Sequence, residues 1–170
     1  MEFIIENCSS PGAQFSRSTN QVMLKIAEWI NQNNEPDLMF IDFRRRLEKE
    51  AKINDNNARN IYPLLKNGGL VEYQAGGELE TGSFFTRRGK AYIIALETKA
   101  LIDSSDYTKK QKEAASVEVD QILENIVYDS VKLLIENKEL NYSESLKWYV
   151  LFLSKFGKIN RQEFADERKS

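Results

Sequence analysis

Side chains that commonly perform catalysis are scarce in this sequence. The 170 residues include no histidine, which removes the usual general base and the nucleophile pairs that depend on an imidazole. Cys8 is the only cysteine, so neither an internal disulfide nor a multi-thiolate metal site can form within the chain. We therefore expect no catalytic residue, no metal site and no cofactor.

One combination of acidic residues and a lysine superficially matches a catalytic pattern. Pro36-Asp37 followed by Glu50-Ala51-Lys52 resembles the motif of PD-(D/E)XK metal-dependent nucleases. The residues between them have helical periodicity, however, and a helix that rises about 1.5 Å per residue would hold Asp37 and Glu50 roughly 20 Å apart. Two carboxylates at that separation cannot share a metal ion. The sequence therefore favours a protein that is not an enzyme.

Three helices are predicted in the first half of the chain. Ser18 and Gln21 have capping-box spacing before the first apolar stripe. Turn-favouring asparagines start the third helix, and Gly68 and Gly69 end it, because a helix C-terminus often requires a left-handed residue. The three predicted spans are residues 19–31, from 37 or 38 to 52, and from about 54 to 67.

A small β-hairpin and a fourth helix are expected next. Residues 70–74 alternate like a half-buried strand, residues 75–82 contain glycines typical of a loop, and residues 83–85 supply the returning strand. Thr86 can cap the following helix, in which Gly89 marks a close approach of two backbone segments. The residues expected to point inward from this helix are Ile93, Leu96 and Ala100.

The last third of the chain predicts two further helices. The first spans about 107–137 and carries a broad apolar stripe in its second half. The second ends near Phe156 and is apolar nearly all round. Such a helix needs partners on several sides, so we expect core packing or a subunit interface there. The alternative is a ligand pocket lined by its aromatic residues, which are Trp148, Tyr149, Phe152 and Phe156.

The sequence INDNNARNIYPLLKNGGLVEY, followed by SFFTRRGKAYIIALE, resembles the winged helix-turn-helix proteins of the MarR and PadR type. Gly69-Leu70-Val71 resembles the entry to their first wing strand, and Thr86 to Gly89 resembles the cap of the helix after the wing. The resemblance covers about residues 18–100, and we match the region after residue 100 to no family. It implies a mainly α fold with a small β-hairpin wing (α+β), followed by a C-terminal helical extension.

The expected organisation has three parts. Residues 1–17 form an N-terminal arm or a short strand, residues 18–103 form the winged helix-turn-helix domain, and residues 104–170 form a helical region for packing or dimerisation. The resemblance implies that the third helix enters the major groove of double-stranded DNA. A transcriptional regulator that acts as a homodimer through its C-terminal helices is then the leading expectation.

The resemblance also implies which residues contact DNA bases. An asparagine can pair bidentately with adenine and an arginine with guanine, and each good pair contributes about 1–3 kcal/mol of discrimination. The alternative is that the asparagines merely cap and solvate the helix. The candidates on the third helix are Asn56, Asn57, Arg59 and Asn60.

Two further basic groups are candidates for phosphate contacts. Arg87, Arg88 and Lys90 lie at the start of a helix, where the helix dipole disfavours positive charge, so they are retained for another purpose such as phosphate binding or remain a solvated surface. Arg44 and Arg45 on the second helix can flank the DNA backbone. The alternative for these two is pairing with nearby carboxylates at helical spacing.

Two observations oppose DNA binding. The wing tip from Gly76 to Glu80 is acidic, and its charges would repel phosphates. The sequence pI of about 5.4 requires any DNA contact to come from a local basic patch. The alternative function is therefore a non-catalytic winged-helix module or accessory subunit that docks another protein.

The location expected from the sequence is the cytoplasm. No stretch approaches the roughly 18 consecutive apolar residues that span a bilayer, and the first residues lack the basic start of a signal peptide. We therefore expect a soluble protein with no membrane partner.

Overall fold

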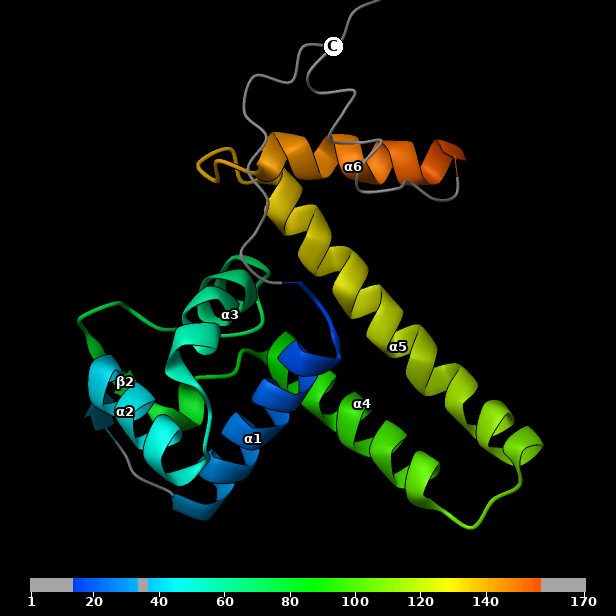
Figure 1. The fold of residues 1–170 in the computed structure, drawn as a ribbon, viewed down its shortest axis with the longest axis horizontal. Helices are drawn as coiled ribbons and strands as arrows, with labels where there is room; N and C mark the ends of the chain where they lie inside the picture. Colours follow the sequence, from blue (N-terminus) through cyan, green and yellow to red (C-terminus); the bar gives the residue numbers. More distant parts are fainter. Residues whose placement is uncertain (1–13, 34–36, 157–170) are drawn as a thin grey trace, which may run out of the picture.

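The computed structural model describes residues 14–33 and 37–156, which form a mainly helical molecule with a small antiparallel sheet (Figure 1). This confirms the predicted fold class, mainly α with a small β-hairpin wing. Residues 1–13 of the predicted N-terminal arm, with Cys8, and residues 157–170 lie outside the described ranges. The elements are α1 (Arg17–Asn33), β1 (Asp37–Met39), α2 (Phe40–Glu50), α3 (Asp55–Asn67), β2 (Glu78–Glu80), the 3₁₀ turn η1 (Thr81–Ser83), α4 (Arg87–Ser104), α5 (Lys109–Glu136) and α6 (Ser143–Phe156).

The apolar faces of α1, α2 and α3 meet in an interior that is rich in aromatic rings. Apolar residues recur every three or four positions on each helix, so each helix has one stripe to bury. Phe43 of α2 is fully buried. Its ring centroid lies 5.6 Å from that of Trp29 and 5.0 Å from that of Phe84. These contacts join α1, α2 and the Phe84 segment, which leads into α4, in one core.

Helix α3 ends as the glycines predict. Gly69 has a φ of +72°, in the left-handed region that glycine adopts without a steric cost. The Leu70 amide donates to the Leu65 carbonyl at 2.8 Å, and the Gly69 amide donates to the Lys66 carbonyl at 2.9 Å. This pair of hydrogen bonds is a Schellman motif. It turns the chain sharply from α3 into the wing.

The start of α4 is fixed against this turn. The Thr86 hydroxyl accepts a hydrogen bond from the Gly89 amide at 3.0 Å and donates one to the Gly69 carbonyl at 2.8 Å. A Cβ on Gly89 would lie 1.9 Å from the Leu70 carbonyl oxygen. The expected close approach at Gly89 is therefore present. It seats the N-terminus of α4 on the C-terminal end of α3.

The wing strands differ partly from the prediction. Val71 and Phe85 form an isolated antiparallel bridge, so the two predicted strand segments face each other. The longer ladder instead pairs β2 with β1, in the register Asp37–Glu80, Leu38–Leu79 and Met39–Glu78.

Two boundaries in this region were predicted wrongly. Residues 37–39 form β1 and not the start of a helix, and residues 78–80 form β2 and not a loop. Strands of three residues carry too little alternation to be recognised. Their stability comes from pairing with each other across a long stretch of sequence, which local patterns do not report.

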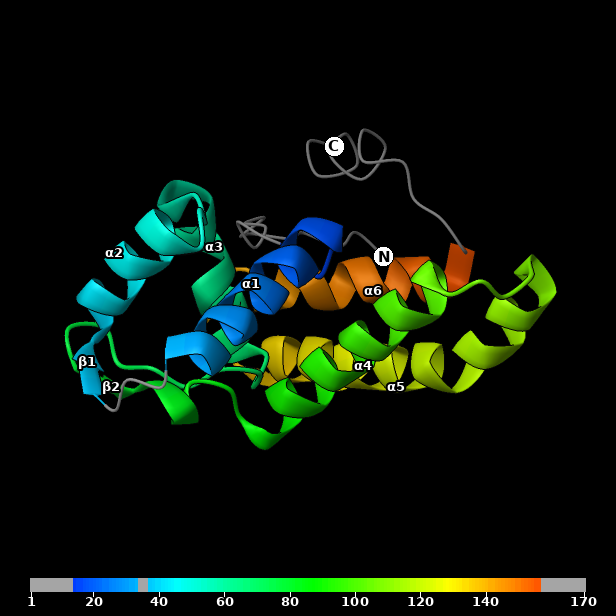
Figure 2. The same ribbon diagram turned by 90° about the horizontal axis from the view of Figure 1, so that it is seen from below.

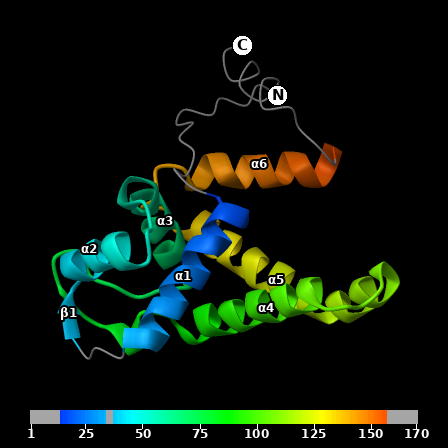
Figure 3. The same ribbon diagram turned by 60° about the horizontal axis from the view of Figure 1, so that its bottom comes forward.

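The second half of α4, with α5 and α6, forms an extension that reaches away from the wing. Figures 1 and 2 show α4 and α5 side by side and antiparallel, with the turn between them at the opposite end of the molecule from the wing. Ile93 and Leu96 are buried as expected, but Ala100 is exposed. Helix α6 turns back at the end of α5 and diverges from it (Figure 3).

None of the described helices is both long enough and apolar enough to cross a membrane.

Candidate nucleic-acid interface

Helix α3 has one buried face and one polar, exposed face. Ala58 is fully buried, and the helical repeat places the polar residues beside it on the opposite side. Asn56, Arg59 and Asn60 are exposed, so the structure brings these predicted base-contacting residues together within about one turn of helix. The side chain of Asn57 lies outside what the structure describes.

Asp55, the first residue of α3, binds two arginines. Its carboxylate accepts hydrogen bonds from Arg44 Nε at 2.9 Å and Arg44 Nη2 at 2.6 Å, and from Arg59 Nε at 2.9 Å. Burial by itself would raise the pKa of the Asp55 carboxyl, but the hydrogen bonds and charges of the two arginines outweigh it and hold the pKa below its ordinary value. Asp55 therefore stays ionised at neutral pH. Sequence reasoning missed this residue.

The two predicted phosphate contacts on α2 have different surroundings. The side chain of Arg44 is only 16% exposed, and its guanidinium lies 5.9 Å from the ring centroid of Phe40. Its ion pair with Asp55 joins α2 to α3, so we leave Arg44 out of the proposed interface. Arg45 is 73% exposed and forms a surface ion pair with Asp42 at 3.2 Å, which costs little to break.

The basic residues at the start of α4 lie near the C-terminal end of α3. Arg88 is 3.8 Å from the Asp129 carboxylate on α5. Arg87 and Lys90 are exposed, and within residues 14–33 and 37–156 neither forms an ion pair. Arg59 lies about two helical turns before the end of α3. The structure therefore does not gather the predicted base and phosphate contacts into a single cluster.

The wing is acidic along its strands and not at its tip. Gly76, with a φ of +76°, makes the turn, and the exposed carboxylates follow it. Asp37 lies directly opposite Glu80 in the β1–β2 ladder, and like charges at such a position destabilise the pair. Exposed carboxylates on and beside these strands belong to Asp37, Glu72, Glu78 and Glu80.

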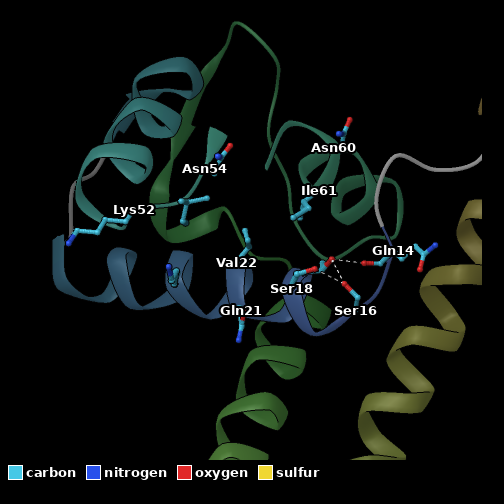
Figure 4. A pocket seen from close by; sticks show the side chains of 12 residues that line it. Gln14, Ser16, Ser18, Gln21, Val22, Lys52, Asn54, Asn60 and Ile61 are labelled. Atoms are coloured by element: carbon cyan, nitrogen blue, oxygen red, sulfur yellow. Dashed lines mark hydrogen bonds between the residues drawn. The ribbon is translucent and has the colours of Figure 1, made fainter. Parts of the chain in front are cut away.

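A groove lies between α1 and α3, on a side of α3 that sequence reasoning did not consider (Figure 4). It has a volume of about 370 Å³, and its lining includes Lys25 of α1 and Lys52 of the α2–α3 turn but no carboxylate. Because these two lysines are far apart in the sequence, no local motif connects them. The only available signal was the helical periodicity that places Lys25 on the outer face of α1.

The nuclease-like residues do not meet. The Glu50 carboxylate accepts a hydrogen bond from Trp29 Nε1 at 2.7 Å, at the end of α2. Asp37 lies in β1, before the start of α2. Among the described residues, no group of three or more His, Cys, Asp or Glu side chains is arranged to hold a metal ion.

Comparison of the chain with models of known protein families, with curated proteins and with solved structures finds no match. The function must therefore be argued from the residues and their geometry.

Proposed function

We propose that this protein is a non-catalytic, winged-helix DNA-binding protein that regulates transcription, with the exposed face of α3 in the major groove of double-stranded DNA. The observation that carries the proposal is the cluster of Asn56, Arg59 and Asn60 on that face. Major-groove recognition uses such side chains at the N-terminal end of a helix. The order helix, strand, helix, helix, strand, helix, with the two strands paired antiparallel, supports the same proposal.

The hydrogen bond between Asp55 and Arg59 favours base contacts over phosphate contacts at this position. Arg59 is 62% exposed, and its Nε atom is bound to Asp55. Its two terminal amino groups make no hydrogen bond within the described part of the chain. They can donate side by side to O6 and N7 of guanine, while the nearby carboxylate repels a phosphate. Asp55 thereby orients Arg59 before DNA arrives.

We also propose that two copies pair through α6. Val150 and Leu151 are adjacent in sequence, and their side chains are 36% and 46% exposed, so apolar side chains face solvent on more than one side of this helix. Glu144 lies in its first turn and Lys155 in its last, so an antiparallel pair of α6 helices would bring opposite charges together. A symmetric dimer would present two copies of α3 to two DNA half-sites.

The experiment is a salt titration of duplex DNA binding by the wild-type chain and by Arg59→Ala. We expect measurable affinity at low salt and a steep decrease as salt rises. Arg59→Ala should weaken binding by about 1–3 kcal/mol and relax the preference for guanine at one position in a selection from random duplexes. Arg59→Lys is the control, because it keeps the charge and loses the paired donors. No binding at low salt would contradict the proposal.

The second candidate function is docking of a basic protein surface on the wing. The observation that favours it is the row of carboxylates on β1 and β2, where Asp37 faces Glu80 without a neutralising cation in the register. A cationic partner would relieve this repulsion. Glu78→Lys with Glu80→Lys should abolish co-purification of such a partner, and nuclease treatment should leave it intact. Loss of the partner on nuclease treatment would exclude this candidate.

A further inference from the structure

The groove between α1 and α3 adjoins the exposed face of α3. Figure 4 shows Val22 and Ile61 between α1 and α3, whereas Lys52, Asn54 and Asn60 stand at the rim of the groove. Asn60 immediately follows Arg59 on α3. A macromolecule bound along the exposed face of α3, which includes both residues, would therefore reach the rim of the groove.

The two lysines of the groove are cations that no acidic side chain neutralises. Lys25 and Lys52 are exposed, and neither forms an ion pair within the described ranges. Arg44, Arg59 and Arg88 each lie within 4 Å of a carboxylate, at distances of 2.6, 2.9 and 3.8 Å. The lysines are therefore available to an external anion, and no carboxylate lines the groove to repel it.

Lys52 occupies its position at a conformational cost. Its φ is +52°, which makes it the only non-glycine residue with a positive φ among those the structure describes. This left-handed conformation follows the end of α2, where the Ile53 amide donates to the Leu47 carbonyl at 3.2 Å. Glycine is the residue that adopts this conformation without strain. A lysine there, with its side chain standing at the groove rim, is consistent with a use for its charge.

The opposite charge lies on the wing. The exposed carboxylates of Glu78 and Glu80 stand on β2, and Asp37 stands beside them on β1. A duplex that touched the wing would place phosphates against these carboxylates, and every such contact would be repulsive. A duplex displaced toward α1 would instead meet Lys25 and Lys52. The electrostatic contrast between the groove and the wing thus favours the groove for the DNA backbone.

We infer that the groove between α1 and α3 binds the phosphate backbone of the duplex, through Lys25, Lys52 and Asn60, and that the wing stays off the DNA. The inference rests on the proposed function and specifies how the duplex lies on α3. The contact is made at the rim, where Lys52 and Asn60 stand (Figure 4), and by Lys25 on α1. The groove is therefore assigned to a polymer backbone that passes over it.

The test compares pairs of neutralised charges. The groove variant carries both Lys25→Gln and Lys52→Gln. The α5 variant carries both Lys109→Gln and Lys110→Gln, which make the same charge change at the start of α5, far from α3 (Figure 1). Binding to random-sequence duplex DNA is measured across a range of salt concentrations. The groove variant should bind at least about tenfold more weakly and lower the slope of log affinity against log salt by about 2, since each phosphate contact contributes about 0.9. The α5 variant should match the wild type.

A third variant tests the wing. Glu78→Gln with Glu80→Gln should change affinity by less than about twofold, because charges farther away than a Debye length of about 10 Å are screened. A tenfold gain would place the wing on the DNA and overturn the inference. All exchanged side chains are exposed, so thermal unfolding should confirm that each variant is folded.

The outcomes separate this inference from the proposal on which it rests. If Arg59→Ala weakens binding and the groove variant does not, the groove inference is overturned and DNA binding through α3 stands. If the groove and α5 variants weaken binding equally, the effect is one of net charge and the inference is also overturned. If the wild-type chain binds no duplex at low salt, both fail.

Discussion

The body formed by α1, α2, α3, the wing and the first half of α4 buries its apolar side chains, whereas the extension exposes many of its own. Among the described residues, the buried core cluster runs from Met23 to Leu96. Helices α5 and α6 contribute no buried member to it, although Leu123, Ile126 and Val127 of α5 pack against it partly buried. Large apolar side chains that are more than a third exposed lie mostly in the extension: Leu101, Tyr107, Val117, Ile122, Tyr128, Leu133, Tyr149, Val150 and Leu151. The body buries its large apolar side chains in one core, whereas the extension leaves many of its own exposed to solvent.

This difference indicates that the body and the extension have different roles. A core whose buried members all lie within the first hundred residues can hold α3 rigidly, as the proposed recognition surface would require. Apolar residues that stay exposed over several helices are typical of an interaction surface and contribute little to the stability of one chain. Four substitutions test this difference between body and extension. They are ordered from the largest expected change in the free energy of unfolding to the smallest.

Phe43→Ala should have the largest effect, because it removes a fully buried ring from the centre of the body. We expect a loss of about 3–5 kcal/mol in the free energy of unfolding, measured by denaturant titration. Ile41→Ala on the same helix is the control, since Ile41 is 41% exposed and should cost less than about 1 kcal/mol. Similar costs at the two positions would show that the body lacks the tight core described above.

Leu134→Ala should have the next largest effect, but within the extension. Leu134 is 1% exposed and belongs to α5, outside the main core cluster. We expect a loss of about 2–5 kcal/mol, with hydrogen exchange faster in α5 and α6 than in α3. Leu133→Ala is the matched control, because Leu133 is the adjacent residue on α5 and its side chain is 37% exposed. If Leu134→Ala made hydrogen exchange in α3 faster by as much as in α5 and α6, the body and the extension would unfold as one unit.

Asp55→Asn should cost about 1.5–3 kcal/mol at neutral pH, because it removes the charged acceptor of Arg44 and Arg59. The pKa of the folded Asp55 carboxyl lies below its ordinary value of 3.8. The charged form therefore stabilises the fold above about pH 4, and this contribution is lost as the pH falls through the folded pKa.

The difference between the wild type and Asp55→Asn should accordingly be constant near neutral pH and should shrink below about pH 4. Unfolding by denaturant at several pH values measures it. Asp42→Asn is the control, because the Asp42–Arg45 pair is exposed and should contribute less than about 1 kcal/mol. A difference that grows on acidification would mean that Asp55 is not stabilised in its charged form.

Leu151→Gln should have the smallest effect on the folding of one chain, within about 0.5 kcal/mol, because the side chain is 46% exposed. It should nevertheless weaken self-association, measured by sedimentation at several protein concentrations. Leu101→Gln, at an exposed position on α4, is the control and should leave self-association unchanged. Unaltered dimers with Leu151→Gln, or a monomeric wild type, would contradict pairing through α6.

The features that sequence patterns predicted well are local. The glycine stop of α3 follows from the left-handed φ at Gly69, and the α4 cap follows from Thr86, because each depends on hydrogen bonds between residues near in sequence. The polar face of α3 follows from the helical repeat. The α+β fold class could be predicted for these reasons.

The features that sequence patterns missed depend on residues far apart along the chain. The β1–β2 pairing joins two strands of three residues whose own preferences are weak. Asp55 was not expected to bind Arg44, because the turn between α2 and α3 sets their distance. Ala100 was expected to be buried but is exposed, because the helical repeat alone does not report which turns of a helix a neighbour covers.

Sequence alone determined the order of the helices and the polar character of α3, because periodicity, caps and glycine conformations act over a few residues. Only the tertiary structure decided which charges remain available around α3. It places carboxylates next to Arg44 and Arg59, leaves Lys25 and Lys52 without one, and sets the acidic strands on the wing. The physical reason is that electrostatic interactions depend on distance in space, which the fold alone supplies.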